Sequence, residues 1–406
     1  MKKSLIALAA LAATASFAQS TVEIYGGLDV GLGQVKGGQA GLNNTSYIVP
    51  ASQAATGLAN AFTRNGLTAN FIGFRGTEDL GGGMKAFFDL QSANMDMSTG
   101  STALTFNRES ALGLSGSFGS LKLGRSVSTM CSVGCGFDMN MIGAGNANAL
   151  NGLSAASVNS SSRRSNQIEL TLPTMAGVTA RVATIMKGDA VEDSTFNNAL
   201  GSTAAAAGTN NAFLNYKAVY ALGLNYANGP LRAAYALETA NSDSAARRNA
   251  QFAAVDYDFG VVKAVASYTV NGTIGGNFAG GTNVAAKNYI GYTNLSSTAG
   301  TSTGKGYGFG LSAPIGAATV GVQWSNNTEN QTKATELFAR YAMSKRTQLY
   351  TYYTVTSGVA AAGNTALISG TTAVTAPTVT NNINAYGVSV IPVNPTVFGL
   401  GVRHTF

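Results

Sequence analysis

Residues 216–238 read YKAVYALGLNYANGPLRAAYALE. Along the first half, the even positions from Tyr216 to Tyr226 hold the larger apolar side chains, and their neighbours are smaller or more polar. The alternation continues through the second half, and only Asn228-Gly229-Pro230 separates the two. A period of two residues on both sides of such a turn predicts a β-hairpin with one apolar face.

The same alternation recurs along the chain, and sixteen strands are expected in all. An even number of strands, with tight turns on one rim and long loops on the other, is typical of bacterial transmembrane barrels. The expected strands are 21–34, 66–76, 83–93, 104–116, 119–127, 164–173, 176–186, 214–226, 230–239, 250–258, 260–270, 304–313, 316–326, 333–343, 346–356 and 396–406. Tight connections are expected at 77–82, 228–229, 258–260, 314–315 and 344–345, and long ones at 35–65, 128–163, 187–213, 271–303 and 357–395.

The composition points to a surface that faces lipid. Charged residues make up only 11% of the chain, compared with about 25% in typical soluble domains. After residue 18 there is no run of 18 apolar residues, which excludes membrane-spanning helices. Alternation of lipid-facing and lumen-facing side chains gives a barrel an apolar outer surface without any long apolar run in the sequence. Closure of the sheet lets every backbone N–H and C=O group form a hydrogen bond within the barrel, which lipid cannot provide. The predicted fold is therefore an all-β transmembrane antiparallel β-barrel of sixteen strands.

The N-terminus has the form of a secretory signal peptide. Two lysines follow Met1, an apolar run extends from Leu5 to about Ala15, and Ser16-Phe17-Ala18 fits the small-x-small pattern of a cleavage site. The run is much shorter than the roughly 20 apolar residues of a membrane-spanning helix. We therefore expect residues 1–18 to be a signal peptide for export through the periplasm, and residues 19–406 to form one barrel domain.

The sequence indicates neither catalysis nor nucleic-acid binding. His404 is the only histidine and lies in the last expected strand, so no Ser or Cys nucleophile has a histidine base. Gly81-Gly82-Gly83 lies in a turn without a following helix, which excludes a phosphate-binding loop. Lysine and arginine are scattered without a basic run, although the pI is near 9.3. We expect no enzyme activity, cofactor, metal or nucleic-acid partner.

Aromatic residues mark the strand ends and the C-terminus. The last strand alternates up to Phe406, where the chain stops. A terminal aromatic on an alternating strand resembles the signal read by the outer-membrane barrel assembly machinery. Aromatic residues also lie near the ends of other expected strands, where their amphipathic rings suit the two headgroup interfaces of a membrane. The alternative interpretation of these aromatics is ordinary core packing in a soluble β-protein. The expected girdle residues are Tyr25, Phe71, Phe74, Phe87, Phe88, Tyr257, Phe259, Trp324, Tyr341, Tyr350, Tyr352 and Tyr353.

Several segments resemble Gram-negative trimeric porins, in particular those of neisserial and related proteobacterial envelopes. Val22–Asp29 resembles the first strand of that family, and Ile72–Gly83 resembles its first periplasmic turn. The matches cover both ends of the mature chain in the right order. The others are Asn107–Glu109, Phe118–Arg125, Tyr341–Thr347 and Gly401–Phe406.

The resemblance implies a homotrimer in the outer-membrane lipid, each barrel being a water-filled channel for small hydrophilic solutes and ions. The third long loop, about 128–162, is then expected to fold into the lumen opposite a row of basic side chains. Transfer of the family pattern places Arg108 and Arg163 on this wall and Arg75 deeper on the same side. The constriction residues expected are Arg75, Arg108, Arg163, Arg164 and, on the loop, Asp138.

Alternation supports only part of this placement. Arg163 has the opposite parity to Ile168, which predicts an inward side chain. Arg108 shares its parity with Leu112 and would face lipid unless a β-bulge intervenes, so its lumenal placement follows from the resemblance alone. Arg164 also has outward parity, but it lies close to the loop, where parity fails.

Two departures from the family pattern bear on selectivity. Phe71 stands where the family usually has a basic residue, and the loop at 128–162 has a single carboxylate, Asp138, where relatives often have several. Fewer acids opposite the arginines leave a positive constriction, and basic side chains in a pore of low dielectric constant concentrate anions. The sequence therefore predicts a weak to moderate preference for anions.

Cys131 and Cys135 lie four residues apart in the same loop. A zinc site would require two more ligands, and His404 lies at the far end of the chain. An oxidising envelope permits a short disulfide, which is the preferred interpretation over two free thiols.

Two alternatives to a general-diffusion channel are open. An adhesin or structural barrel would have a plugged lumen and would give no single-channel conductance steps. A substrate-specific channel, for example for sugars, would need aromatic side chains along the lumen. The outward parity of most aromatics argues against it, although Tyr25, Phe71 and Phe87 can face inward.

Overall fold

The computed structural model describes residues 21–36, 58–63, 67–68, 70–93, 104–140, 163–186, 216–242, 248–271, 305–328, 333–357, 359–360, 392–393 and 396–406. The signal peptide expected at residues 1–18 lies outside this part of the chain. Most of the described residues are in strands, and the helices among them are α3 (Thr129–Gly134) and the short 3-10 helix η1 (Cys135–Phe137). The strands are β1 (Thr21–Lys36), β2 (Leu58–Thr63), β3 (Phe71–Gly81), β4 (Met84–Ser92), β5 (Glu109–Gly116), β6 (Gly119–Val127), β7 (Arg163–Thr171), β8 (Val178–Ile185), β9 (Tyr216–Asn228), β10 (Leu231–Ser242), β11 (Arg248–Asp258), β12 (Lys263–Asn271), β13 (Lys305–Ile315), β14 (Ala318–Asn327), β15 (Lys333–Ala342), β16 (Thr347–Ser357), β17 (Val359–Ala360), β18 (Pro392–Val393) and β19 (Thr396–Thr405).

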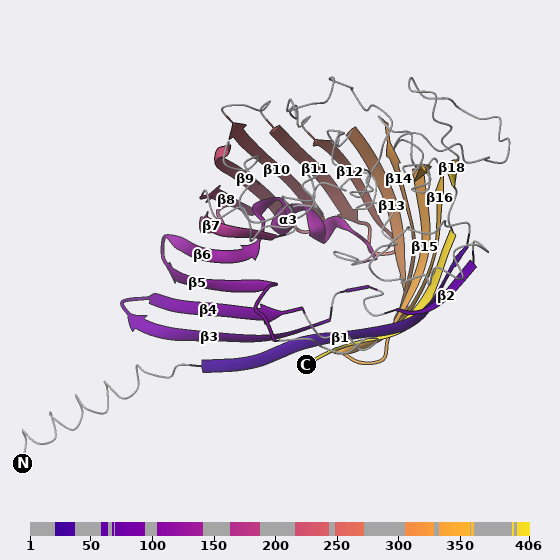
Figure 1. Ribbon diagram of the computed structural model, residues 1–406, viewed down its shortest axis with the longest axis horizontal. Helices are drawn as coiled ribbons and strands as arrows, with labels where there is room; N and C mark the ends of the chain where they lie inside the picture. Colours follow the sequence, from indigo (N-terminus) through magenta and orange to yellow (C-terminus); the bar gives the residue numbers. More distant parts are fainter. Residues whose placement is uncertain are drawn as a thin grey trace, which may run out of the picture.

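Sixteen of these strands form a closed antiparallel ring. From β3 to β16 each strand pairs with the next one in sequence, and β19 joins β16 to β1. The closing register runs from Gly27 opposite Thr405 to Lys36 opposite Thr396. Figure 1 shows β1 and the C-terminal strand side by side at this seam. The predicted antiparallel barrel of sixteen strands is confirmed.

The expected strand 66–76 starts late, because the chain turns inward before it. The first half of β1 pairs with β3, and the second half pairs with the separate short strand β2. Between them, the Asp29 carboxylate accepts hydrogen bonds from the backbone N–H groups of Leu67 (2.7 Å) and Thr68 (2.8 Å). Asn70 Oδ1 in turn accepts one from the Asp29 N–H (2.5 Å). These contacts hold the chain off the ladder, so β3 begins only at Phe71, and β2 lies in the expected connection 35–65.

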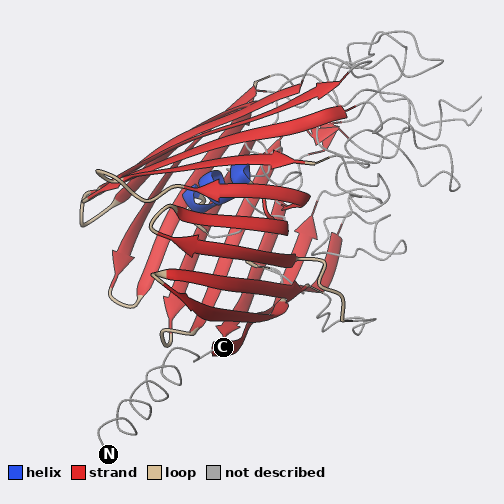
Figure 2. Ribbon diagram, turned by 90° about the vertical axis from the view of Figure 1, so that its left-hand side faces the viewer, coloured by secondary structure: helices blue, strands red, loops and turns tan. Residues whose placement is uncertain are grey.

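Two tight turns lie later in the chain than expected. The first was expected at 77–82, but Glu78 and Asp79 still pair with β4. The turn follows at Gly82 and Gly83, whose positive φ angles of 62° and 79° suit glycine. Likewise β13 continues through Ile315 before Gly316 turns with φ of 61°. The tight turns gather at one end of the barrel (Figure 2).

The two faces of the sheet have the reverse of the polarity found in a soluble β-protein. Large apolar side chains such as Leu112 (62% exposed) point outward, whereas polar ones such as Gln323 and Glu336 (both 0%) are enclosed by the ring. An apolar exterior around a polar interior is the arrangement that lipid outside and water inside require. In the part of the chain that the structure describes, no helix has the length and apolar character needed to cross a membrane.

Not every expected girdle aromatic faces the lipid. Tyr350 and Tyr352 are buried and stacked (ring centroids 6.2 Å apart), while their neighbours Leu349 and Tyr353 are exposed. The girdle prediction is therefore wrong for these two, and for Tyr25, Phe71 and Phe87, which follow the inward parity. A nearby glycine leaves room for each ring on the inner wall. The pairs are Tyr25 with Gly73, Phe71 with Gly27, Phe87 with Gly113, Tyr350 with Gly401, and Tyr352 with Gly399.

Candidate pore-lining site

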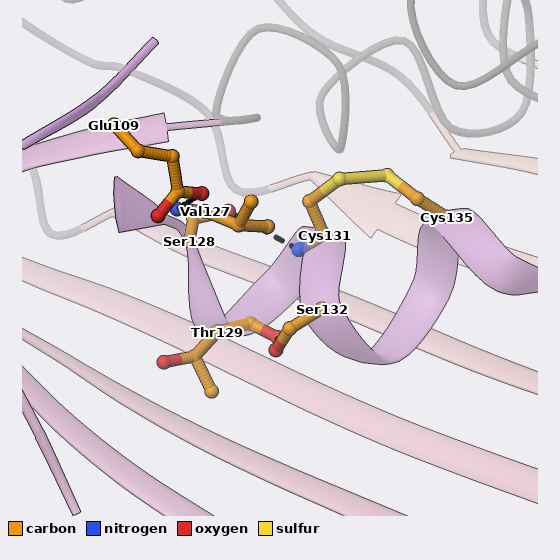
Figure 3. Close-up of a disulfide and its surroundings, with 7 residues drawn as sticks. All are labelled: Glu109, Val127, Ser128, Thr129, Cys131, Ser132 and Cys135. Atoms are coloured by element: carbon orange, nitrogen blue, oxygen red, sulfur yellow. Dashed lines mark hydrogen bonds between the residues drawn. A yellow bond between two sulfur atoms is a disulfide. The ribbon is translucent and has the colours of Figure 1, made fainter. Parts of the chain in front are cut away.

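The segment Ser128–Asn140 lies within the ring, where α3 contacts β9, β10 and β11 (Figure 1). Ser128 caps α3: its Oγ accepts a hydrogen bond from the Cys131 backbone N–H (3.1 Å, Figure 3). Thr129 Oγ1 donates to the Glu169 carboxylate of β7 (2.6 Å). The rest of the loop expected at 128–162 lies outside the described residues, so the inward fold of the whole loop stays a prediction.

Small residues on β9 make room for α3. A Cβ atom at Gly223 would lie 2.6 Å from Val133 Cγ2 and 2.9 Å from Thr129 Cγ2, which is closer than real contacts allow. The other side of the segment packs on β11, where the rings of Phe137 and Phe252 are 6.3 Å apart. The helix is therefore fitted against the wall, and the sequence pattern gave no sign of this close approach.

Gly223→Val is expected to push α3 off β9 into the lumen and to lower the single-channel conductance, because the added methyl groups cannot fit beside Val133 and Thr129. Planar-bilayer recording of the purified protein measures the change. Leu224→Val, which alters the adjacent outward position, is the matched control. An unchanged conductance in Gly223→Val would contradict this packing.

A disulfide joins Cys131 and Cys135 (Figure 3). The bond connects the first turn of α3 to the first residue of η1, and both sulfur-bearing residues pack against the apolar cluster around Met130, Val133 and Phe137. Among the described residues no cluster of three or more metal-ligating side chains occurs. The bond closes the short helical segment on itself and fixes the position of η1.

The far end of the segment is anchored to β14 and β15. Met139 N–H donates to Gln323 Oε1 (3.0 Å), and Gln323 Nε2 donates to Asp138 Oδ1 (3.0 Å). Asn140 Nδ2 donates to Glu336 Oε1 (2.5 Å). Asp138, expected at the constriction, is only 6% exposed and serves as an anchor. The segment thus follows the inner wall from β6 to β15 and leaves the wall of β1, β3, β4 and β5 facing it.

Arg108 lies on that remaining wall. It precedes β5 in a bend, and its backbone N–H donates to the Gln91 carbonyl of β4 (3.0 Å). Its side chain turns inward: Nε donates to Gln91 Oε1 (2.9 Å), and the guanidinium lies 4.6 Å from the centre of the Phe71 ring. The expected strand 104–116 starts only at Glu109, so the parity that pointed Arg108 toward lipid does not apply.

Arg163 and Arg125 lie near Arg108. Arg163 begins β7 opposite Val127, and it interacts electrostatically with Arg108, Glu109 and Arg125. Its Nε is buried and has no hydrogen-bond partner among the residues that the structure describes. Arg125 was not expected at the site; it donates to the Asn107 carbonyl (2.5 Å) and to Ser165 Oγ (2.7 Å). These three arginines, here called the basic wall, lie around the buried carboxylate of Glu109.

Arg164 faces inward, contrary to its parity. The register of β6 and β7 shifts between Gly124 and Ser126, and Asn166 has a positive φ of 54°. This bulge reverses the alternation toward the start of β7, so Arg164 turns inward and the alternation that predicted an inward Arg163 does not extend to that end of the strand. Arg164 is then 1% exposed and forms an ion pair with Glu238 of β10, with 2.5 Å between Nη2 and Oε1. A carboxylate therefore neutralises its charge.

Arg75, Arg340 and Arg403 add to the basic lining. Arg75 lies nearer the tight-turn end on β3 and forms a half-exposed ion pair with Glu23 (2.8 Å). Arg340 of β15 lies 5.5 Å from the centre of the Phe338 ring and interacts electrostatically with Arg403 of β19. Arg403 alternates with Val402 and His404 in the last expected strand, whereas nothing in the sequence singles out Arg340.

The C-terminal residue takes part in closing the ring. Phe406 and Gly26 exchange two backbone hydrogen bonds of 3.2 Å, and the Phe406 ring lies where a Cβ of Gly26 would stand. The expected role of Phe406 as an assembly signal is a separate matter and stays a prediction.

The chain has clear likenesses among known proteins. A model of the Gram-negative porin family matches residues 5–361. An outer membrane porin protein of Bordetella pertussis is 30% identical over 385 residues, which cover 87% of this chain and 93% of the relative. Outer membrane porin protein 32 of Delftia acidovorans is 40% identical over 126 residues, which cover 31% of this chain and 32% of the relative.

Solved structures show the same fold. An anion-selective porin from Comamonas acidovorans has a TM-score of 0.57 and 20% identity, with 96% of this chain and 100% of that chain covered. An outer membrane protein of Vibrio cholerae has a TM-score of 0.55 and 9% identity, with 95% and 98% covered. At these identities the likeness concerns the fold alone.

Proposed function

Because the chain belongs to the Gram-negative porin family, which makes it an outer-membrane channel and not an enzyme, we propose that small hydrophilic solutes and ions diffuse passively through its lumen with a weak to moderate preference for anions. The solutes cross in water. Selectivity then follows from the width and charge of the narrowest part.

The basic wall is the observation that carries the proposed anion preference. The side chain of Arg108 is hydrogen-bonded to a neutral amide, Gln91, and Arg163 adds a second positive charge beside it. Across the lumen, the only carboxylate in the described part of the loop, Asp138, is buried and bonded to Gln323. An excess of guanidinium groups in a narrow water-filled space raises the local concentration of anions. One structural neighbour, which shares the fold at 20% identity, is an anion-selective porin.

Other parts of the proposal rest on the family. We propose a homotrimer in the outer-membrane lipid, a loop at 128–162 that folds inward over its whole length, removal of residues 1–18 on export, and recognition of Phe406 by the barrel assembly machinery. The contacts of Ser128–Asn140 with β9, β14 and β15 support the inward loop.

A KCl gradient across a planar bilayer is the test of the anion preference. We expect the sign of the reversal potential to show a higher permeability for chloride than for potassium, because the arginines of the wall attract chloride and repel potassium. Potassium preference would contradict the proposal. Liposome swelling with neutral and charged solutes of graded size tests passive diffusion in the same preparation, and absence of swelling would favour a plugged adhesin or structural barrel.

A further inference from the structure

Four side chains on the inner wall form a continuous stack, here called the Arg–aromatic column: Arg108 just before β5, Phe71 and Arg75 of β3, and Tyr25 of β1. The Arg108 guanidinium lies 4.6 Å from the centre of the Phe71 ring, and the Arg75 guanidinium lies 4.6 Å from that of Tyr25. The two rings meet edge to face, with centroids 5.8 Å apart and an angle of 74°. The column therefore presents two aromatic rings between two cations.

The backbone explains why the rings lie along the wall. Phe71 is opposite Gly27 in the β1–β3 register, and Tyr25 is opposite Gly73. Carbon atoms of the two rings lie 3.3 Å and 2.6 Å from where the missing Cβ atoms would stand. Each ring therefore leans over a glycine, and both remain partly exposed inside the ring of strands. A solute in the lumen can reach apolar surface at this position.

The charges of the column are unequal. Arg75 is paired with the Glu23 carboxylate (2.8 Å), whereas the side-chain hydrogen bond of Arg108 goes to the neutral Gln91 amide (2.9 Å). The Tyr25 hydroxyl donates to Asp89 and accepts from Gln91 Nε2 (2.8 Å), so its hydrogen-bonding capacity is occupied within the wall. The end of the column at Arg108 thus combines positive charge with apolar ring surface. Asp89 and Glu109 are the acidic groups nearby.

From this juxtaposition we propose that the Arg–aromatic column is a binding subsite for small carboxylates that carry an aromatic ring. This inference rests on the proposed anion channel and names a solute class for it. The carboxylate of such a solute pairs with the Arg108 guanidinium, and its ring packs on Phe71 and Tyr25. A small aliphatic carboxylate gains only the first interaction, and a neutral sugar gains only contact with the rings.

Phe71 is the residue that decides this preference. A basic residue at this position would add charge to the wall without any apolar surface. The aromatic residue in its place lowers the wall charge by one and supplies the ring that Arg108 covers. Charge alone does not separate two monovalent carboxylates, so a difference between them must come from the rings.

The test compares potassium benzoate with potassium acetate as the only permeant salts in planar bilayers. The benzoate conductance of the natural chain is expected to half-saturate at a concentration roughly three- to tenfold lower than that of acetate, the range that one aromatic pair supplies. Phe71→Leu should bring this ratio close to one. Phe71→Tyr retains a ring and should keep it. The matched control is Phe74→Leu, which changes an outward ring packed against Phe106 and should keep the ratio of the natural chain.

The two salts are compared within the same variant. A general change in pore width affects both half-saturation concentrations and therefore cancels in their ratio. Equal half-saturation for the two salts would overturn the subsite, and so would an unchanged ratio in Phe71→Leu. Block of the current by maltose but not by benzoate would also overturn it, in favour of a sugar channel. The KCl reversal potential of the same membranes reports on the proposed anion preference separately, because it involves no aromatic solute.

Discussion

Arg164→Ala is expected to lower the free energy of unfolding by about 3–5 kcal/mol, because it leaves the Glu238 carboxylate buried without its cation. Arg164 and Glu238 are 1% and 3% exposed, and the pair bridges β7 and β10 beside α3. The carboxylate is enclosed on the inner wall, so removal of the cation leaves a buried charge without compensation. Urea titration of the folded barrel in detergent micelles, followed by its heat-modifiable electrophoretic mobility, measures the loss.

The chain offers a matched control in the ion pair of Arg75 with Glu23. Its side chains are 52% and 58% exposed, so Arg75→Ala should cost no more than about 1 kcal/mol. The double variant Arg164→Met with Glu238→Met removes both charges and should recover most of the stability lost in Arg164→Ala. Equal losses in Arg164→Ala and Arg75→Ala would show that the buried pair is not the support that its geometry indicates.

Arg108→Glu is expected to reverse the ion preference, with a fall of roughly tenfold in the permeability ratio of chloride to potassium. The change replaces a cation by an anion near Asp89 and Glu109, which shifts the local charge by two units toward negative. The reversal potential in a KCl gradient at about 0.1 M measures the effect, because screening is moderate at that ionic strength.

Arg108→Lys controls for the side chain itself, since it keeps the charge and should change the ratio less than twofold. Folding of both variants is checked by heat-modifiable mobility. If Arg108→Glu retained the chloride preference of the natural chain, the guanidinium would not lie on the path of the ions.

The alternation of side chains was sufficient to predict the barrel, since each strand must present one face to lipid and the other to water. In β10 the same alternation places Arg232 on the inner face, where it pairs with Asp256 of β11. It failed where the backbone leaves the regular ladder. The bend at Arg108, the bulge before Gln167 and the inward chain between β2 and β3 each shift parity locally, and a period of two cannot register such a shift.

The inward aromatics had a different cause. Tyr350 and Tyr352 lie near the girdle residues in sequence and were assigned to the lipid face by composition alone. Their parity with Thr354, and the glycines opposite them at Gly399 and Gly401, carried the correct signal. Long-range anchors such as Asn140 with Glu336 are 196 residues apart in sequence, and no local pattern indicates them.

Single-channel recording of the purified protein in planar bilayers tests the central claim most directly: that the polar inner face encloses a continuous path for water and ions beside the segment Ser128–Asn140. We expect discrete conductance steps of uniform size whose current rises in proportion to voltage. A correctly folded barrel that inserts into the bilayer and gives no steps would contradict the account.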